Sequence, residues 1–242
     1  MRKRDLHSLP NIFTAINLLS GASCVFALVS QYDLIVPVCI IISLVCDFFD
    51  GFVARKMNIA SNIGKELDSL ADVISFGLVP SFMVMRMFNF HFDFSTSIQG
   101  LLLFILPLTI AIYSAFRLAK FNMETRDSEY FYGLNTPSNT IMILGIFLSW
   151  QNNKWNLVQI FDHNIPLLIA LVGLVNYLLI SNTPMFSNKS ITKQWKGNIP
   201  FIILGIILVV TVFFFQYIGI SITILCYVLM SLMTLRWKII KI

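Results

Sequence analysis

Charged residues are scarce in this chain of 242 residues. They make up 12% of the sequence, while hydrophobic residues make up 57% and the mean hydropathy is +0.80. A typical soluble domain is about 25% charged. One core of this size cannot bury so much apolar surface, so lipid is expected to cover the remainder. The composition therefore excludes a soluble globular domain, a disordered chain and a secreted disulfide scaffold.

Cysteine and histidine are also few, and their positions exclude two kinds of chemistry. The four cysteines lie inside apolar runs without paired or metal-ligand spacing, so we interpret them as small buried hydrophobic residues. The three histidines lie at expected membrane interfaces, far in sequence from the acidic residues described below. The chain thus predicts neither a zinc site nor a histidine base, and it contains no internal repeat.

Long apolar runs dominate what is present. Runs of roughly 17–25 apolar residues are typical of transmembrane helices, and the sequence predicts an all-α, polytopic membrane helix bundle of about eight. The expected spans are 12–30, 34–54, 65–88, 98–120, 137–151, 164–182, 199–216 and 218–235. Residues 3–16 read as a short interfacial helix preceding the first span, because apolar residues share one face after a basic start. We expect one integral membrane domain, with a six-helix core over 1–182 and two additional helices over 199–235.

The basic residues support this count and orient it. The net charge is +5 and the isoelectric point is about 9.1, yet the charges flank the expected spans rather than forming a nucleic-acid surface. Five clusters of three hold fifteen of the seventeen Lys and Arg residues: 2–4, 55–65, 117–126, 189–196 and 236–241. All five fall on one side, whereas Arg86 and Lys154 fall on the other. Basic loops stay in the cytoplasm. The sequence therefore predicts a cell-membrane protein whose two termini and five basic clusters lie on the cytoplasmic side.

Four acidic residues lie in or beside apolar helix: Asp47, Asp50, Asp68 and Asp72. A charge at membrane depth costs a few kcal/mol and is usually functional and paired. The first two residues are three apart and the last two are four apart, so each pair shares one helix face. The short connection between the second and third spans predicts an antiparallel hairpin, which brings both pairs to a similar depth and lets them face each other.

Four facing carboxylates repel one another unless cations lie between them. All-oxygen ligands suit hard ions such as Mg²⁺, Mn²⁺ or Ca²⁺, and four carboxylates can hold two such ions in a phosphoryl-transfer centre. Gly51, Ala54 and Gly64 leave room beside the helices, and Arg55 is a natural phosphate partner. Helix-packing glycines with interfacial charges are the simpler interpretation, but it does not explain four acids on facing helices.

The complete pattern is Asp47-x-x-Asp50-Gly51-x-x-Ala54-Arg55, eight residues, then Gly64-x-x-x-Asp68-x-x-x-Asp72. It resembles the signature of the CDP-alcohol phosphotransferase family at all eight fixed positions. The resemblance covers the first six spans. It implies an intramembrane enzyme, usually a homodimer, that transfers a substituted phosphate from a CDP-linked donor to an alcohol and releases CMP.

The resemblance also assigns roles to individual residues. It implies that Asp47, Asp50 and Asp68 hold two divalent cations, and that Asp72 assists with metal and takes the proton of the acceptor hydroxyl. It further implies that four residues line the CDP pocket: Gly51, Ala54, Arg55 and Gly64. Thr14 and Asn17, at the start of the first span, are candidates for contacts to CDP-diacylglycerol, although helix packing accounts for them almost equally well.

Further segments indicate the acceptor. Residues 10–17, 73–80, 116–122 and 132–139 resemble the phosphatidylserine synthase branch of the family, with Lys120 and Asn135 as departures from it. This resemblance implies transfer from CDP-diacylglycerol to L-serine. Arg117 and Lys120 are candidate partners for the serine carboxylate, although they can equally be membrane-flanking anchors. Ser75 either shapes the serine site or accompanies a kink in the third span.

Two alternatives remain open in the sequence. The same chemistry can serve another acceptor, such as glycerol 3-phosphate or inositol phosphate, which would call for a more basic pocket. A divalent-cation transporter is an alternative of a different class. Transporters usually hold ions near the bilayer midplane between repeats, whereas these acids lie toward one surface and no repeat is present.

Overall fold

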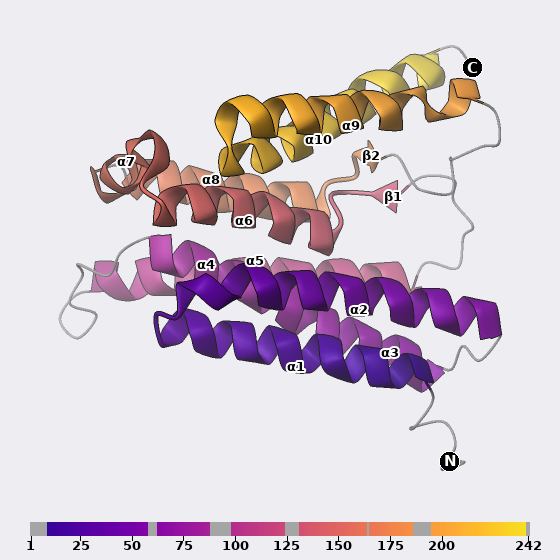
Figure 1. Ribbon diagram of the computed structural model, residues 1–242, viewed down its shortest axis with the longest axis horizontal. Helices are drawn as coiled ribbons and strands as arrows, with labels where there is room; N and C mark the ends of the chain where they lie inside the picture. Colours follow the sequence, from indigo (N-terminus) through magenta and orange to yellow (C-terminus); the bar gives the residue numbers. More distant parts are fainter. Residues whose placement is uncertain are drawn as a thin grey trace. The chain divides into compact units, whose positions relative to one another are not determined.

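The structure is a computed structural model that describes residues 9–57, 62–87, 98–123, 131–163, 165–185 and 195–240. The chain divides into two compact units, Met1–Phe121 and Asn122–Ile242. Both are built almost entirely of helices (Figure 1). The units are described separately below, and every aspartate singled out above belongs to the first.

The first unit is a bundle in which helix α1 is central. Its elements are α1 (Leu9–Val29), the 3₁₀ turn η1 (Asp33–Ile35), α2 (Val36–Met57), α3 (Asn62–Asp72), the π-helical segment η2 (Val73–Leu78), α4 (Val79–Met87) and α5 (Ile98–Met123). α1 packs along α2 and also contacts α3, η2 and α4 (Figure 1). It therefore touches both arms of the predicted hairpin, which places its side chains beside the aspartates.

The third predicted span, 65–88, is a continuous helical stretch with a π-helical interior. α3, η2 and α4 together form a helix over Ile63–Met87 that is long enough to cross a membrane. The π-helical segment begins directly after Asp72, and π-helical turns often occur at functional sites. Gly77 in this segment lets α5 approach, because a Cβ at residue 77 would lie 3.1 Å from the Ser114 Cβ. The irregularity expected near Ser75 thus takes the form of a π segment.

One of the two basic residues outside the predicted cytoplasmic clusters has an acidic partner. The Arg86 Nη2 lies 3.0 Å from the Asp33 Oδ2, and the two side chains are only 18% and 13% exposed. The ion pair joins the last turn of α4 to the 3₁₀ turn between α1 and α2. Because this ion pair carries no net charge, Arg86 can lie outside the basic clusters.

The second unit contains five helices among its described residues, together with a two-stranded ribbon. Strand β1 (Phe131–Tyr132) pairs antiparallel with β2 (Pro184–Met185). The remaining elements are α6 (Thr136–Gln151), η3 (Lys154–Asn156), α7 (Leu157–His163), α8 (Ile165–Ile180), α9 (Trp195–Phe215) and α10 (Tyr217–Ile240). Asn135 caps α6, since its Oδ1 accepts a hydrogen bond of 2.8 Å from the Ser138 N–H.

The turn between the last two helices falls at Gln216, which has a φ of 54°. This position agrees with the boundary between the expected spans 199–216 and 218–235. Gly219 lies inside α10 and packs against the backbone of Thr211 in α9. Its carbonyl oxygen accepts a hydrogen bond of 3.0 Å from the Thr211 Oγ1. The glycine is needed for close helix packing rather than for chain reversal.

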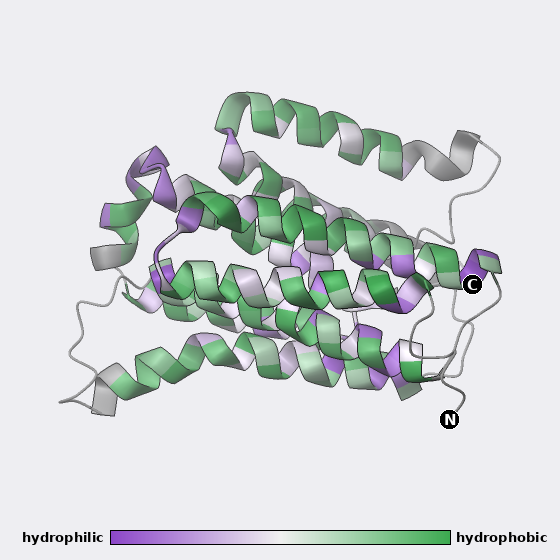
Figure 2. Ribbon diagram, turned by 60° about the horizontal axis from the view of Figure 1, so that its bottom comes forward, coloured by the Kyte–Doolittle hydropathy of each residue, from purple (hydrophilic) through white to green (hydrophobic). Residues whose placement is uncertain are grey.

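The described residues contain fewer candidate membrane spans than the eight predicted. By length and composition, four described helices can cross a membrane: Leu9–Val29, Asp33–Met57, Ile63–Met87 and Leu101–Met123. A bent pair, Lys154–Phe161 with Ile165–Ile180, brings the number to five if it forms one span, whereas the apolar parts of α9 and α10 are shorter. Hydrophobic residues cover most of these helices (Figure 2). The count of eight is not confirmed.

The predicted interfacial helix over 3–16 is not confirmed either. Residues 9–16 form the first turns of α1, which continues without a break to Val29. The preceding residues of that prediction lie outside the described part of the chain. Where it is described, this segment is part of the candidate span Leu9–Val29, which is assigned by length and composition.

Candidate active site and metal centre

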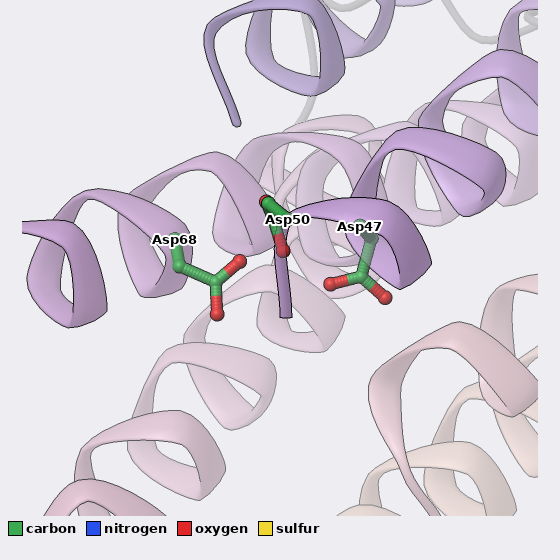
Figure 3. Close-up of side chains that lie close together, drawn as sticks. All are labelled: Asp47, Asp50 and Asp68. Carbon is green, nitrogen blue, oxygen red and sulfur yellow. The ribbon is translucent and has the colours of Figure 1, made fainter. Parts of the chain in front are cut away.

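Three carboxylates converge where α2 and α3 face each other. Asp47 and Asp50 lie on α2, and Asp68 lies on α3. One carboxylate oxygen from each lies within 4.8 Å of the others, and Figure 3 shows the three side chains turned toward a common space. The helical spacing aligns the first two, and the hairpin brings in the third. The predicted meeting of acids from both arms is therefore present for these three residues.

The three carboxylates fit a hard divalent cation. Carboxylates at this separation repel one another, by about 4 kcal/mol per pair at 4 Å and an effective dielectric of 20. The Asp68 Oδ1 is buried and has no hydrogen-bond partner, so one potential ligand atom is unsatisfied by the described protein. An all-oxygen set of this kind suits Mg²⁺, Mn²⁺ or Ca²⁺. The site's residues thus match the ion class that the sequence predicts.

Asp72, the fourth predicted member, is not part of this group of three. It lies one helical turn beyond Asp68 and is 7% exposed. Its Oδ1 accepts a hydrogen bond of 3.3 Å from the Asn17 Nδ2 of α1. Three of the four predicted aspartates are thus grouped, and the fourth, Asp72, is hydrogen-bonded to α1 beside them.

Thr14 holds one of the three grouped aspartates. Its hydroxyl donates a hydrogen bond of 2.8 Å to the Asp50 Oδ2 and also lies 3.1 Å from the Pro10 carbonyl oxygen. Asp50 is 5% exposed, so this contact replaces water that the carboxylate loses on burial. α1 thereby contributes to the aspartate site through two residues one turn apart, Thr14 and Asn17.

A pocket of about 190 Å³ opens beside Asp50 and Asp68. It is lined by Pro10, Asn11, Thr14, Asp50, Gly51, Ala54, Arg55, Gly64, Lys65 and Asp68. Five of the six residues assigned to CDP-diacylglycerol binding are in this set: Thr14, Gly51, Ala54, Arg55 and Gly64. The sixth, Asn17, is not among them. The pocket combines small residues, two exposed cations and two of the grouped carboxylates.

The guanidinium group of Arg55 lies over the neighbouring turn of α2. A Cβ at Gly51 would lie 3.4 Å from the Arg55 Nη1, so the absence of a side chain at residue 51 gives the guanidinium space inside the pocket. Lys65 and Asn11 also line the pocket, and the sequence interpretation assigned no role to either. In the sequence, Lys65 directly follows Gly64, and Asn11 lies in the segment 10–17 that resembles the family. These two positions indicate that both residues lie near the pocket.

The three residues predicted to bind serine do not line this pocket. The Ser75 hydroxyl donates a hydrogen bond of 3.0 Å to the Asn17 carbonyl oxygen, so it is engaged in helix packing. Arg117 is half-buried and Lys120 is exposed, both on α5. Their roles toward an acceptor stay predictions.

Several curated relatives carry the same name. The chain is 30% identical over 211 residues to the CDP-diacylglycerol–serine O-phosphatidyltransferase of Helicobacter pylori (strain 26695), covering 86% of this chain and 82% of the relative. It is 29% identical to the Bacillus subtilis protein of the same name (80% and 99% covered), and 27% identical to that of Methanocaldococcus jannaschii (84% and 87% covered).

A protein-family model also matches the chain. Residues 7–161 match the CDP-alcohol phosphatidyltransferase family, a range that includes the aspartate trio, Asp72 and the whole pocket. The family is one of phosphotransferases, and the described part of the chain contains four or five helices able to cross a membrane. This chain is thus an integral membrane member of the CDP-alcohol phosphatidyltransferase family.

Proposed function

We propose that the chain transfers the phosphatidyl group of CDP-diacylglycerol to the hydroxyl of L-serine, giving phosphatidylserine and CMP. The single observation that carries the chemistry is the pocket in which two carboxylates of the trio, Asp50 and Asp68, lie with the cations Arg55 and Lys65. A diphosphate beside divalent ions needs both kinds of group. The acceptor rests on the names of the relatives.

The pocket supports binding of the nucleotide diphosphate end of the donor. Arg55 and Lys65 offer N–H donors to phosphate oxygens, while Gly51, Ala54 and Gly64 allow the ligand to approach the backbone of α2 and α3. The exposed apolar faces of the same helices suit the acyl chains, which remain in lipid. These contacts orient the donor with its diphosphate toward the aspartates.

The aspartates support the transfer itself. Asp47, Asp50 and Asp68, with Asp72 as a further candidate, would hold two Mg²⁺ or Mn²⁺ ions. When bound, such ions neutralise the diphosphate and stabilise the departing phosphate charge. Asp72 takes the proton of the serine hydroxyl as the serine oxygen bonds to the phosphorus that carries diacylglycerol. The bond from that phosphorus to CMP breaks, and its electron pair leaves on the CMP phosphate.

The proposal also covers the orientation of the protein in the membrane and its assembly. The basic clusters favour a cytoplasmic pocket and cytoplasmic termini in the cell membrane, where soluble serine and CMP can enter and leave. The family resemblance favours a homodimer.

A comparison of acceptors tests the proposal. Purified protein supplied with CDP-diacylglycerol and Mn²⁺ or Mg²⁺ is offered serine, glycerol 3-phosphate or inositol phosphate, and CMP and the lipid product are measured. We expect serine-dependent CMP release with phosphatidylserine as the lipid. Faster release with another acceptor would reject serine but keep the chemistry. Metal binding without CMP release from any acceptor would favour a cation transporter.

A further inference from the structure

Asn17 is placed differently from the other residues assigned to the donor. It is fully buried, at 0% exposed, and it is not among the residues that line the pocket. Its amide nitrogen instead donates to the Asp72 Oδ1 at 3.3 Å. A contact to the nucleotide therefore has no support in this geometry, while a contact to the proposed base is present.

The amide of Asn17 is oriented by this contact. Its second polar atom, Oδ1, is buried and has no hydrogen-bond partner. Burying an unsatisfied acceptor costs free energy, and here the acceptor is Oδ1. Among the described residues, the side chain of Asn17 hydrogen-bonds only to Asp72, through its Nδ2. This contact therefore determines how the amide is turned.

The backbone of Asn17 is fixed from two other elements. Its carbonyl oxygen accepts hydrogen bonds from the Ser43 hydroxyl of α2 (3.3 Å) and from the Ser75 hydroxyl of η2 (3.0 Å). One turn later, Gly21 packs directly on Ser75, because a Cβ there would lie 2.9 Å from the Ser75 Cα. The amide therefore has a fixed position relative to both α2, which carries Asp47 and Asp50, and the helix that carries Asp72.

We propose that Asn17 is a positioning residue that orients the Asp72 carboxylate. The amide occupies Oδ1 and leaves Oδ2 for the acceptor hydroxyl or a metal ion. The π segment that starts at Val73 would otherwise leave Asp72 at an irregular point of its helix, and the contact from α1 fixes its side chain there. This proposal rests on the proposed function for its kinetic consequence, but not for its effect on metal binding.

The expected size follows from comparable outer contacts. Removal of a group that orients a metal-site carboxylate typically costs about 10–100-fold in activity or metal affinity. Asn17→Ala and Asn17→Asp should therefore lower kcat by about that factor. The KM for CDP-diacylglycerol should change less than about threefold, because the pocket lining is intact.

The experiment pairs kinetics with Mn²⁺ binding, followed by electron paramagnetic resonance on the purified full-length protein without substrate. We expect Mn²⁺ affinity to fall about tenfold in both Asn17 variants. Ser20→Ala is the matched control, since its hydroxyl also joins α1 to α2, at the Cys39 carbonyl oxygen (2.8 Å), without touching an aspartate. The control should keep both kcat and Mn²⁺ affinity.

A double exchange separates positioning from folding. In Asn17→Asp with Asp72→Asn, the hydrogen bond can form in the reverse direction, so thermal stability lost in Asn17→Asp should return. Turnover and Mn²⁺ affinity should not return, because the carboxylate then lies on α1.

Three results would overturn the proposal. They are a raised KM for CDP-diacylglycerol with unchanged kcat, equal losses in Ser20→Ala, and wild-type Mn²⁺ affinity in both Asn17 variants. If wild-type protein transfers nothing to serine, the proposed function fails, while the Mn²⁺ comparison still decides the role of Asn17.

Discussion

The hydroxyl of Thr14 on α1 donates a 2.8 Å hydrogen bond to the Asp50 Oδ2 on α2, across 36 residues of sequence. The contact joins a helix without acidic residues to the helix that carries half of the aspartate motif. The first helix therefore supports the candidate metal centre.

Thr14→Val tests this support. The variant keeps the branched shape but removes the donor, leaving the buried Asp50 carboxylate with one hydrogen bond fewer. We expect Mn²⁺ affinity to fall about tenfold, as measured by binding to the purified protein. Thr14→Ser should bind as the wild type does. Unchanged affinity in Thr14→Val would mean that Asp50 is oriented by other groups.

Gly51→Val tests the space beside Arg55. A side chain at residue 51 enters the pocket next to the guanidinium, whose Nη1 would lie 3.4 Å from the new Cβ. Extra methyl groups in a fitted pocket typically cost about 10-fold or more, so the KM for CDP-diacylglycerol should rise by about that factor.

Gly205→Val on α9 is the control for that substitution, because a Cβ there meets nothing within 4 Å. It should leave the KM unchanged. A similar rise in both variants would show that valine disturbs these helices generally, and would remove the argument that Gly51 makes room for the ligand.

Metal removal should affect stability as well as turnover. Without cations, the carboxylates of Asp47, Asp50 and Asp68 repel one another, and a bound ion stabilises the folded state by about 2.7 kcal/mol at a concentration of 100 Kd. Chelation with EDTA should therefore abolish CMP release and lower the Tm, and Mn²⁺ or Mg²⁺ should restore both. Full activity after exhaustive chelation would contradict the metal centre.

Asp68→Asn provides the complementary change. It removes one of three like charges, so the metal-free variant should melt at or above the Tm of the metal-free wild type. Its Tm should no longer rise with Mn²⁺. A wild-type Mn²⁺ shift in this variant would place the ion elsewhere.

The ion pair between Arg86 and Asp33 should contribute stability without a role in catalysis. Arg86→Leu leaves a largely buried carboxylate unpaired, which typically costs about 3 kcal/mol, and the Tm should fall. Adding Asp33→Leu should recover most of the loss, because both charges are then absent. The KM for CDP-diacylglycerol should stay constant in both variants, since neither residue lines the pocket. A raised KM would connect this ion pair to the site.

The local pattern of the sequence determined much of the site. Helical spacing places Asp47 and Asp50 on one face, and a short connection returns the chain so that Asp68 faces them. The small residues at 51, 54 and 64 lie beside these acids for the same reason, and they line the pocket together with Arg55. Such features depend on helix periodicity and chain connectivity, which a sequence states directly.

Packing between distant segments decided what the sequence left open. The position of α1 across both arms directs the Asn17 amide to Asp72 and the Ser75 hydroxyl to the Asn17 backbone, over separations of 55 and 58 residues. It also brings Asn11 to the same pocket as Lys65. Periodicity identifies which residues share a helix face, but it does not identify the helix that packs against that face. That choice depends on the fit of side chains in the folded bundle, so only the tertiary structure showed that a residue of α1 holds Asp72.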